Sequence, residues 1–300
     1  MPKLPPETLL HRLDLAIRQR VHGDVGGDTK AFGVTGGMEV DRVRPWTPGD
    51  DWRFLDAAAT ARTGTPHVRV PVAERRFTLW LGVDVSSSMA FGTQQWEKGE
   101  LGMSVAAALG LLALRQSGKV GALALGGGAL PVPPRPGRPA LLSLIEDLAP
   151  ARDGVTADLG ADLDRLDRAV RERAVVALIS DFRCVDDSYE APLRRLCARH
   201  EVLPVVVSDP REDELPDVGV ASFVDPETGR TFTIDTKSAK LRRRFAERAA
   251  SRAAARDALI RRCGTEPIHL STDHDWLDTL VSHLENRRRR RWASTSRSGS

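Results

Sequence analysis

Cysteine is scarce in this chain, and the chain contains no long apolar run. The three cysteines, Cys184, Cys197 and Cys263, are odd in number, widely spaced and without a C-x-x-C pair, so we expect neither a disulfide framework nor a zinc site. No apolar window reaches the roughly 18 residues of a membrane-spanning helix. The N-terminus carries charges and prolines where a signal peptide needs an unbroken apolar stretch. These absences predict a cytoplasmic protein without a membrane segment.

A strong excess of one charge is also missing. The 44 Lys and Arg residues are nearly balanced by 41 Asp and Glu, which leaves a formal net charge of +3. Such a balance argues against nucleic-acid binding by the main part of the protein. The exception is the run Arg287–Arg291 near the C-terminus. Its default interpretation is a solvated terminal run, and nucleic-acid binding through this arginine-rich tail stays open as an alternative.

Apolar, strand-like segments alternate with helical patterns from residue 77 onward. With 300 residues and 41% apolar content, the chain can bury a large core in about two domains. Strands that are apolar throughout and alternate with helices predict an α/β fold, with a doubly wound, mainly parallel sheet and helices on both faces. The expected strands are Thr78–Val83, Val120–Leu125, Ala174–Ile179, Val202–Val207 and Pro267–Leu270, and the expected helices between them are Gln95–Gln116, Pro139–Leu148, Gly160–Val170 and Tyr189–His200.

Three regions are predicted along the chain. Residues 1–76 form an extension that packs on the core, with a helix near its start and a strand near its end. Residues 77–286 form the main domain, which includes a hairpin over 221–234 and two C-terminal helices, at 237–263 and 275–285. Residues 287–300 are a basic, serine-rich tail that we expect to be disordered. Within the extension, Gly49-Asp50-Asp51 is interpreted as part of a salt-bridged segment that fastens it to the sheet, with a second recognition surface as the alternative.

Oxygen-bearing side chains follow two of the predicted strands. Asp84, Ser86 and Ser88 come directly after the strand at 78–83, and Asp181 follows the strand at 174–179. In open α/β sheets, ligands bind at the carboxyl ends of the strands where strand order reverses. We therefore expect these four side chains at one spot, with a further hydroxyl from Thr156. Oxygen donors are what Mg²⁺, or another divalent cation such as Mn²⁺, prefers.

This donor set has a chemical consequence. It supplies about five oxygen ligands with only two negative charges, whereas Mg²⁺ takes about six ligands. The remaining coordination position would favour an anion, such as a carboxylate from another protein. The alternative for Asp84, Ser86 and Ser88 is a capped turn without metal.

Catalytic signatures are missing. A haloacid-dehalogenase-type phosphatase needs a second carboxylate two residues after the first, where this chain has Ser86. Neither G-x-S-x-G nor a Walker A loop occurs. The prediction is a non-enzyme, and a metal-dependent hydrolase or phosphatase using Asp84 stays open as an alternative.

Several sequence blocks resemble known families. DVSSSM, followed by Thr156 and LISDF, resembles the metal-ion-dependent adhesion site of von Willebrand factor A-type domains. RVRPWTPGDDWRFLDAAATAR, WEKGE, SDPREDELPDVG and DPETG resemble the bacterial family called domain of unknown function 58, over roughly residues 30–240.

The resemblance implies a fold, a site and a partner. It implies a von Willebrand factor A-like fold whose metal ligands fall on Asp84, Ser86, Ser88, Thr156 and Asp181. It also implies an adaptor that works with a MoxR-type AAA+ ATPase in assembling or maturing other protein complexes. The chain departs from the family at Asp56-Ala57, where an Asp-Trp pair is usual, and it lacks the transmembrane helices that precede the domain in many members.

Overall fold

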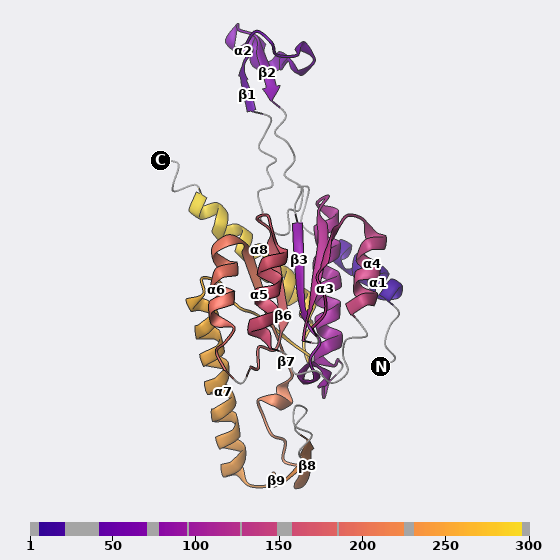
Figure 1. Ribbon diagram of the computed structural model, residues 1–300, viewed down its shortest axis with the longest axis vertical. Helices are drawn as coiled ribbons and strands as arrows, with labels where there is room; N and C mark the ends of the chain where they lie inside the picture. Colours follow the sequence, from indigo (N-terminus) through magenta and orange to yellow (C-terminus); the bar gives the residue numbers. More distant parts are fainter. Residues whose placement is uncertain are drawn as a thin grey trace.

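A six-stranded sheet lies at the centre of this computed structural model, which describes residues 6–21, 42–70, 78–94, 96–126, 128–148, 158–184, 186–224 and 231–295 (Figure 1). The strand order is β10-β7-β6-β3-β4-β5. All neighbours are parallel except β4 and β5, so the prediction of a mainly parallel α/β sheet is confirmed. The strands are β3 (Thr78–Asp84), β4 (Lys119–Leu125), β5 (Val132–Arg135), β6 (Val175–Ser180), β7 (Glu201–Ser208) and β10 (Ile268–Ser271).

The edge strand β5 was not predicted, because its sequence contains Pro133 and Pro134. Proline has no N–H to donate, and a strand at the edge of a sheet can accommodate it. Gly121 of β4 makes the close approach possible, since a Cβ there would lie 2.9 Å from the carbonyl oxygen of Val132. This proline-rich segment, whose local sequence indicates a turn, is therefore a short antiparallel edge strand.

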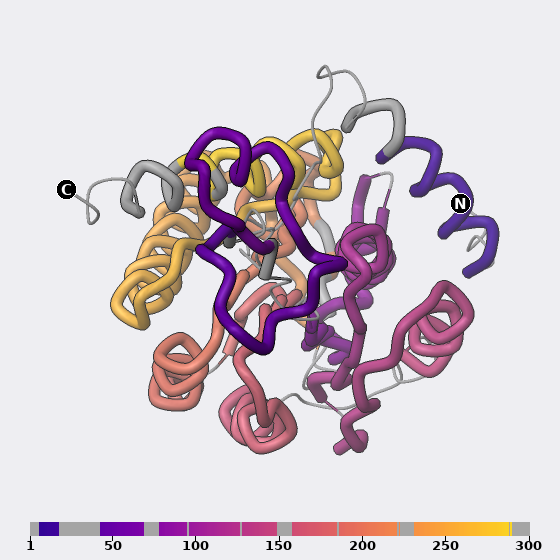
Figure 2. Tube along the Cα trace, turned by 90° about the horizontal axis from the view of Figure 1, so that it is seen from above, coloured from indigo at the N-terminus to yellow at the C-terminus, as the bar shows by residue number. Residues whose placement is uncertain are grey.

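Helices cover both faces of the sheet, as Figure 2 shows with the molecule seen from above. Side chains of successive strand residues point to opposite faces: Leu79, Leu81 and Val83 belong to one buried cluster, and Trp80 belongs to the other. The first face carries α1 (Pro6–Val21), α3 (Lys98–Arg115), α4 (Arg138–Leu148) and α8 (Trp276–Thr295), and the second carries α5 (Leu159–Ala169), α6 (Glu190–Arg199) and α7 (Ala239–Arg262).

The N-terminal part of the described chain has two elements of different kinds. Helix α1 packs on the main domain through buried Leu10, Leu13 and Ile17. Residues 42–70 form a small lobe that appears apart from the sheet in Figure 1. The lobe consists of β1 (Arg42–Pro45), η1 (Trp52–Phe54), α2 (Ala57–Thr63) and β2 (His67–Val70), with β1 and β2 antiparallel.

The charged residues of the GDD block pair inside this lobe. Asp50 accepts two hydrogen bonds of 2.7 Å from the guanidinium of Arg44, and Asp51 pairs with Arg53 at 2.6 Å. The hydrogen bonds from Arg44 and Thr47 hold the pKa of Asp50 well below its usual range. These contacts tie the turn after β1 to the strand itself.

The C-terminal elements follow the predicted order. The hairpin of β8 (Val220–Val224) and β9 (Thr231–Asp235) is confirmed as an antiparallel pair, and its connection at 225–230 lies outside the described residues. Helix α8 continues to Thr295, whereas the sequence predicted a disordered tail from residue 287. Arginine is a good helix former, and Arg287 is anchored by Glu201, 3.3 Å away. In the described part of the chain, no helix combines the length and apolarity needed to cross a bilayer.

Candidate functional site

The two central strands β3 and β6 bring the predicted donors together. They are parallel neighbours, and Val83 of β3 is paired with Ile179 of β6. The next residues, Asp84 and Ser180, therefore lie side by side where both strands end. The 3-10 helix η2 (Ser87–Ala90) follows β3. Asp181 follows β6 directly. The prediction that these two strands are adjacent is confirmed.

Asp84 is buried at the bottom of the site, with 4% of its surface exposed. Its Oδ1 accepts a hydrogen bond from the backbone N–H of Ser86 (2.9 Å), and its Oδ2 accepts one from the hydroxyl of Ser180 (2.5 Å). Burial and the nearby charge of Asp181 raise the pKa of Asp84, although the hydrogen bonds from Ser180 and Ser86 act against this shift. These surroundings hold the carboxyl group of Asp84 firmly but disfavour its isolated negative charge, which a cation would stabilise.

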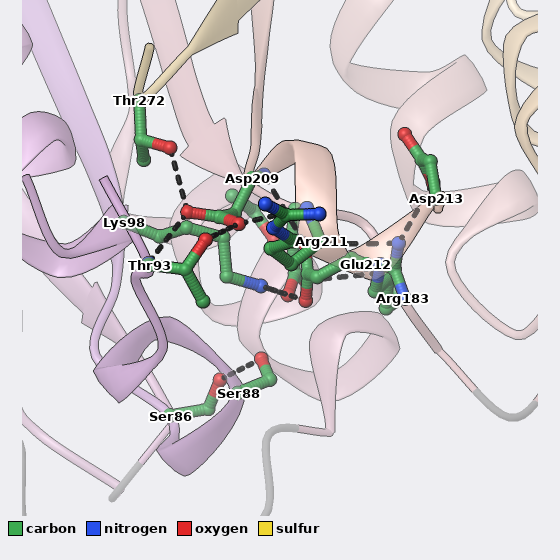
Figure 3. Close-up of polar contacts among 12 residues, drawn as sticks. Ser86, Ser88, Thr93, Lys98, Arg183, Asp209, Arg211, Glu212, Asp213 and Thr272 are labelled. Carbon is green, nitrogen blue, oxygen red and sulfur yellow. Dashed lines mark hydrogen bonds and ion pairs between the residues drawn. The ribbon is translucent and has the colours of Figure 1, made fainter. Parts of the chain in front are cut away.

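Ser86 and Ser88 present two hydroxyl groups on the same side of the loop. Their Oγ atoms are 3.0 Å apart (Figure 3). Two neighbouring ligands of an octahedral Mg²⁺ ion, each at about 2.1 Å, are also about 3.0 Å apart. The hydroxyl pair therefore has a spacing that a hard divalent cation accepts. The residues present fit such an ion in donor type, and the two hydroxyls fit it in their spacing.

Lys98 brings a positive charge to this site, which the sequence analysis did not predict. Lys98 is the first residue of α3, whose N-terminus is closed by a capping box of Glu97 and Glu100. Its ammonium Nζ lies 2.6 Å from Oδ2 of Asp181 and 2.7 Å from Oε1 of Glu212. Figure 3 shows the Lys98 side chain reaching Glu212 beside the two serines. Lys98 has no exposed surface, so its charge is neutralised by protein carboxylates.

The environment of Asp181 differs from that of Asp84. Burial alone would raise the pKa of Asp181, but the charge and hydrogen bond of Lys98 outweigh burial and lower it. The backbone N–H of Arg183 also donates to Oδ1 of Asp181 at 3.0 Å. Asp181 is therefore held as an ionised carboxylate.

The backbone turns sharply directly after Asp181. Phe182 has a φ of 50°, in the left-handed region that side-chain-bearing residues rarely adopt. Its N–H donates to the hydroxyl of Ser180 at 2.9 Å. Its ring is buried and lies against Tyr189, with ring centroids 6.0 Å apart. Packing of the ring fixes the turn that orients Asp181.

Asp209 joins the surrounding loops. It is fully buried and accepts hydrogen bonds from the N–H (2.9 Å) and hydroxyl (2.7 Å) of Thr93, and from the hydroxyl of Thr272 (2.7 Å). It also caps η4 (Pro210–Glu212), the short helix that carries Glu212. Asp209 thereby fixes the position from which Glu212 reaches Lys98.

The structure places four of the five predicted ligands together at the carboxyl ends of the central strands β3 and β6. These are Asp84, Ser86, Ser88 and Asp181, while Thr156 lies outside the described residues. Among the described residues, no three His, Cys, Asp or Glu side chains gather as a metal-binding group, so the hydroxyls are an essential part of the candidate site. Lys98, Asp209 and Glu212 lie within the family-like blocks WEKGE and SDPREDELPDVG, but they were not predicted as site residues. The position of Asp209 and Glu212 directly after β7, which ends at the same edge, was a usable signal.

Comparisons with known proteins agree on one family. The model of the family described as "Protein of unknown function DUF58" matches residues 42–255. Uncharacterized proteins of Mycobacterium tuberculosis and Mycobacterium bovis are each 40% identical over 294 residues, covering 96% of this chain and 91% of theirs. An uncharacterized protein of Mycobacterium avium is 42% identical over 163 residues, covering 53% of this chain and 94% of its own.

Two solved structures from Bacteroides are similar at a lower level. One is the conserved hypothetical protein BatB from Bacteroides thetaiotaomicron, with 15% identity, 71% coverage of this chain, 99% of that chain and a TM-score of 0.47. The other is an aerotolerance-related membrane protein from Bacteroides fragilis, with 14% identity, the same coverages and a TM-score of 0.48. The family match and the mycobacterial relatives show that this chain belongs to the DUF58 family.

Proposed function

We propose that this protein is a non-catalytic, metal-dependent protein-interaction module with a von Willebrand factor A-like fold. The observation that carries the proposal is the meeting of Asp84, Ser86, Ser88 and Asp181 at the carboxyl ends of β3 and β6, with the two serine hydroxyls 3.0 Å apart. These residues, with Thr156, would hold Mg²⁺ or Mn²⁺ as a metal-ion-dependent adhesion site. When bound, the cation supplies a Lewis-acidic position for an acidic side chain of a partner.

The charges around the site support an anionic partner group. Asp84 and Asp181 are the carboxylates among the proposed ligands, and Lys98 neutralises part of the charge of Asp181. A divalent cation held by two carboxylates and uncharged hydroxyl groups would have at least one coordination position left for an anionic group. A carboxylate is the natural protein group to complete its coordination.

The family resemblance suggests the setting for this interaction. It implies a MoxR-type AAA+ ATPase as the partner and a cytoplasmic role in the assembly or maturation of other complexes. The protein would then act as an adaptor, and ATP hydrolysis would be carried out by the ATPase.

The test is capture of partners from a cell lysate by the tagged protein, with Mg²⁺ and with excess chelator. We expect capture of the ATPase only with metal, and its loss in Asp84→Ala. Asp187→Ala removes an exposed carboxylate from a loop near the same edge and serves as the matched control. Capture that persists in chelator and in Asp84→Ala would contradict the proposal. Turnover of phosphate esters by the purified chain, lost in Asp84→Ala, would favour a phosphatase instead.

A further inference from the structure

Lys98 occupies an unusual position for a lysine. It has no exposed surface, and its Nζ joins two carboxylates that come from different elements of the fold. Asp181 follows β6 and Glu212 ends the short helix after β7. A buried ammonium group is stable only when it is paired and hydrogen-bonded. Asp181 and Glu212 provide that pairing at 2.6 and 2.7 Å.

One of these two carboxylates is also a proposed metal ligand. Asp181 belongs with Asp84, Ser86 and Ser88 in the donor set, whereas Glu212 does not. A divalent cation bound to Asp181 would share this carboxylate with an ammonium group already in hydrogen-bond contact with it. Two cations that share one buried carboxylate repel each other strongly, because little water screens their charges.

Glu212 gives the ammonium group a second partner. Its Oε1 accepts from Lys98, while its Oε2 lies 3.6 Å from the guanidinium of Arg183. The N-terminal capping by Asp209 fixes the helix that carries Glu212. Lys98 can therefore stay paired with Glu212 when Asp181 turns to another cation.

We propose that Lys98 is an internal cation that competes with the divalent metal ion for Asp181, and that Glu212 retains the ammonium group when the metal binds. This inference rests on the proposed function, because it concerns the affinity of the same metal site. Lys98 is in this sense an affinity-determining residue. It weakens metal binding to the isolated protein, so that an acidic partner group contributes to holding the metal.

The test compares Mn²⁺ and Mg²⁺ binding to the full chain by calorimetry and by the metal-induced rise in melting temperature. Lys98→Met removes the charge and keeps an unbranched side chain, and we expect the dissociation constant to fall by about tenfold or more. Glu212→Gln leaves Lys98 with Asp181 as its remaining charged partner, and we expect the constant to rise. Lys240→Met removes an exposed lysine and controls for the change in net charge.

The opposite signs of the two expected shifts separate the outcomes. A folded Lys98→Met protein with unchanged or weaker metal affinity would overturn the inference. If Lys98→Met does not fold without metal, the Glu212→Gln variant decides, and unchanged or tighter binding would overturn it. Metal binding that is the same in Asp84→Ala as in the wild type would instead overturn the proposed site. Binding by Lys98→Met alone, with none by the wild type, would support the competition directly.

Discussion

The ammonium of Lys98 lies 2.6 Å from Oδ2 of Asp181, and the two side chains are 0% and 3% exposed. The residues are 83 positions apart in the chain, and they meet because α3 begins beside the strand end that carries Asp181. A buried ion pair of this kind is weak support for stability, but removing one partner leaves the other charge uncompensated. The pair therefore ties the candidate metal site to the core of the domain.

Replacing Ser180 by alanine will destabilise the protein by about 2 kcal/mol. The Ser180 hydroxyl is 1% exposed, donates to Asp84 and accepts from the N–H of Phe182. Its loss leaves Oδ2 of Asp84 without this donor and the N–H of Phe182 without this acceptor. Urea denaturation, monitored by circular dichroism, measures the change in unfolding free energy.

The matched control is Ser222→Ala, at an exposed position of the β8–β9 hairpin. We expect this change to stay within about 0.5 kcal/mol of the wild type. Equal stability of Ser180→Ala and Ser222→Ala would show that the hydrogen bonds of Ser180 contribute nothing to folding.

The variant Asp209→Asn will lose stability at neutral pH, and the loss will shrink in acid. Burial alone would raise the pKa of Asp209, but hydrogen bonds from Thr93, Thr272 and the N–H of Arg211 outweigh burial and lower it. Folding therefore favours the ionised carboxylate. The resulting stabilisation is present above the unfolded pKa of about 3.9 and is lost as the pH falls through the lower folded pKa.

We expect a difference of about 2–3 kcal/mol between wild type and Asp209→Asn at pH 7, because charged hydrogen bonds are lost. Denaturation midpoints measured from about pH 7 down to about pH 2 will then begin to converge below the unfolded pKa, and the difference disappears as the pH falls through the lower folded pKa. Asp217→Asn removes an exposed partner of Arg242 and should change little at any pH. A constant difference for Asp209→Asn across the whole range would refute the role of its ionised form.

Gly110→Ala will destabilise the contact between α3 and α4. A Cβ at this position would lie 2.5 Å from Cδ1 of Leu141, which is 1% exposed. Alanine improves helix propensity by about 1 kcal/mol, but the overlap costs about 1–3 kcal/mol. We expect a net loss of about 1 kcal/mol in thermal or urea unfolding.

Gly102→Ala, in the same helix, is the contrasting variant. Its Cβ would meet Cε of Met89 at 3.3 Å, and a flexible methionine can move aside. We expect no loss or a small gain. The double variant Gly110→Ala/Leu141→Ala should lose less unfolding free energy than the two single variants lose together, because truncating Leu141 removes the overlap. Full additivity would mean that the two residues do not constrain each other.

Much of the fold could be predicted from the order of apolar segments. Strands such as β3 and β6 are buried on both faces, so their sequences are apolar throughout and differ clearly from the helices between them. The edge strand β5 could not be predicted in this way, since Pro133 and Pro134 indicate a turn in local sequence. The helical state of residues 287–295 was also missed, because it depends partly on the distant contact of Arg287 with Glu201.

The order of apolar segments specifies the alternation of strands and helices, and with it the meeting of Asp84, Ser86, Ser88 and Asp181, because the carboxyl ends of parallel strands lie at the same end of a sheet. The surroundings of these side chains depend instead on contacts between elements that are far apart in the chain. Lys98 and Glu212 reach Asp181 from elements that are distant in the chain, and no local pattern encodes such contacts. They follow from the packing of α3 and η4 on the sheet. The proposed metal ligands thus form a recognisable sequence motif, whereas the buried lysine beside them is brought there by packing.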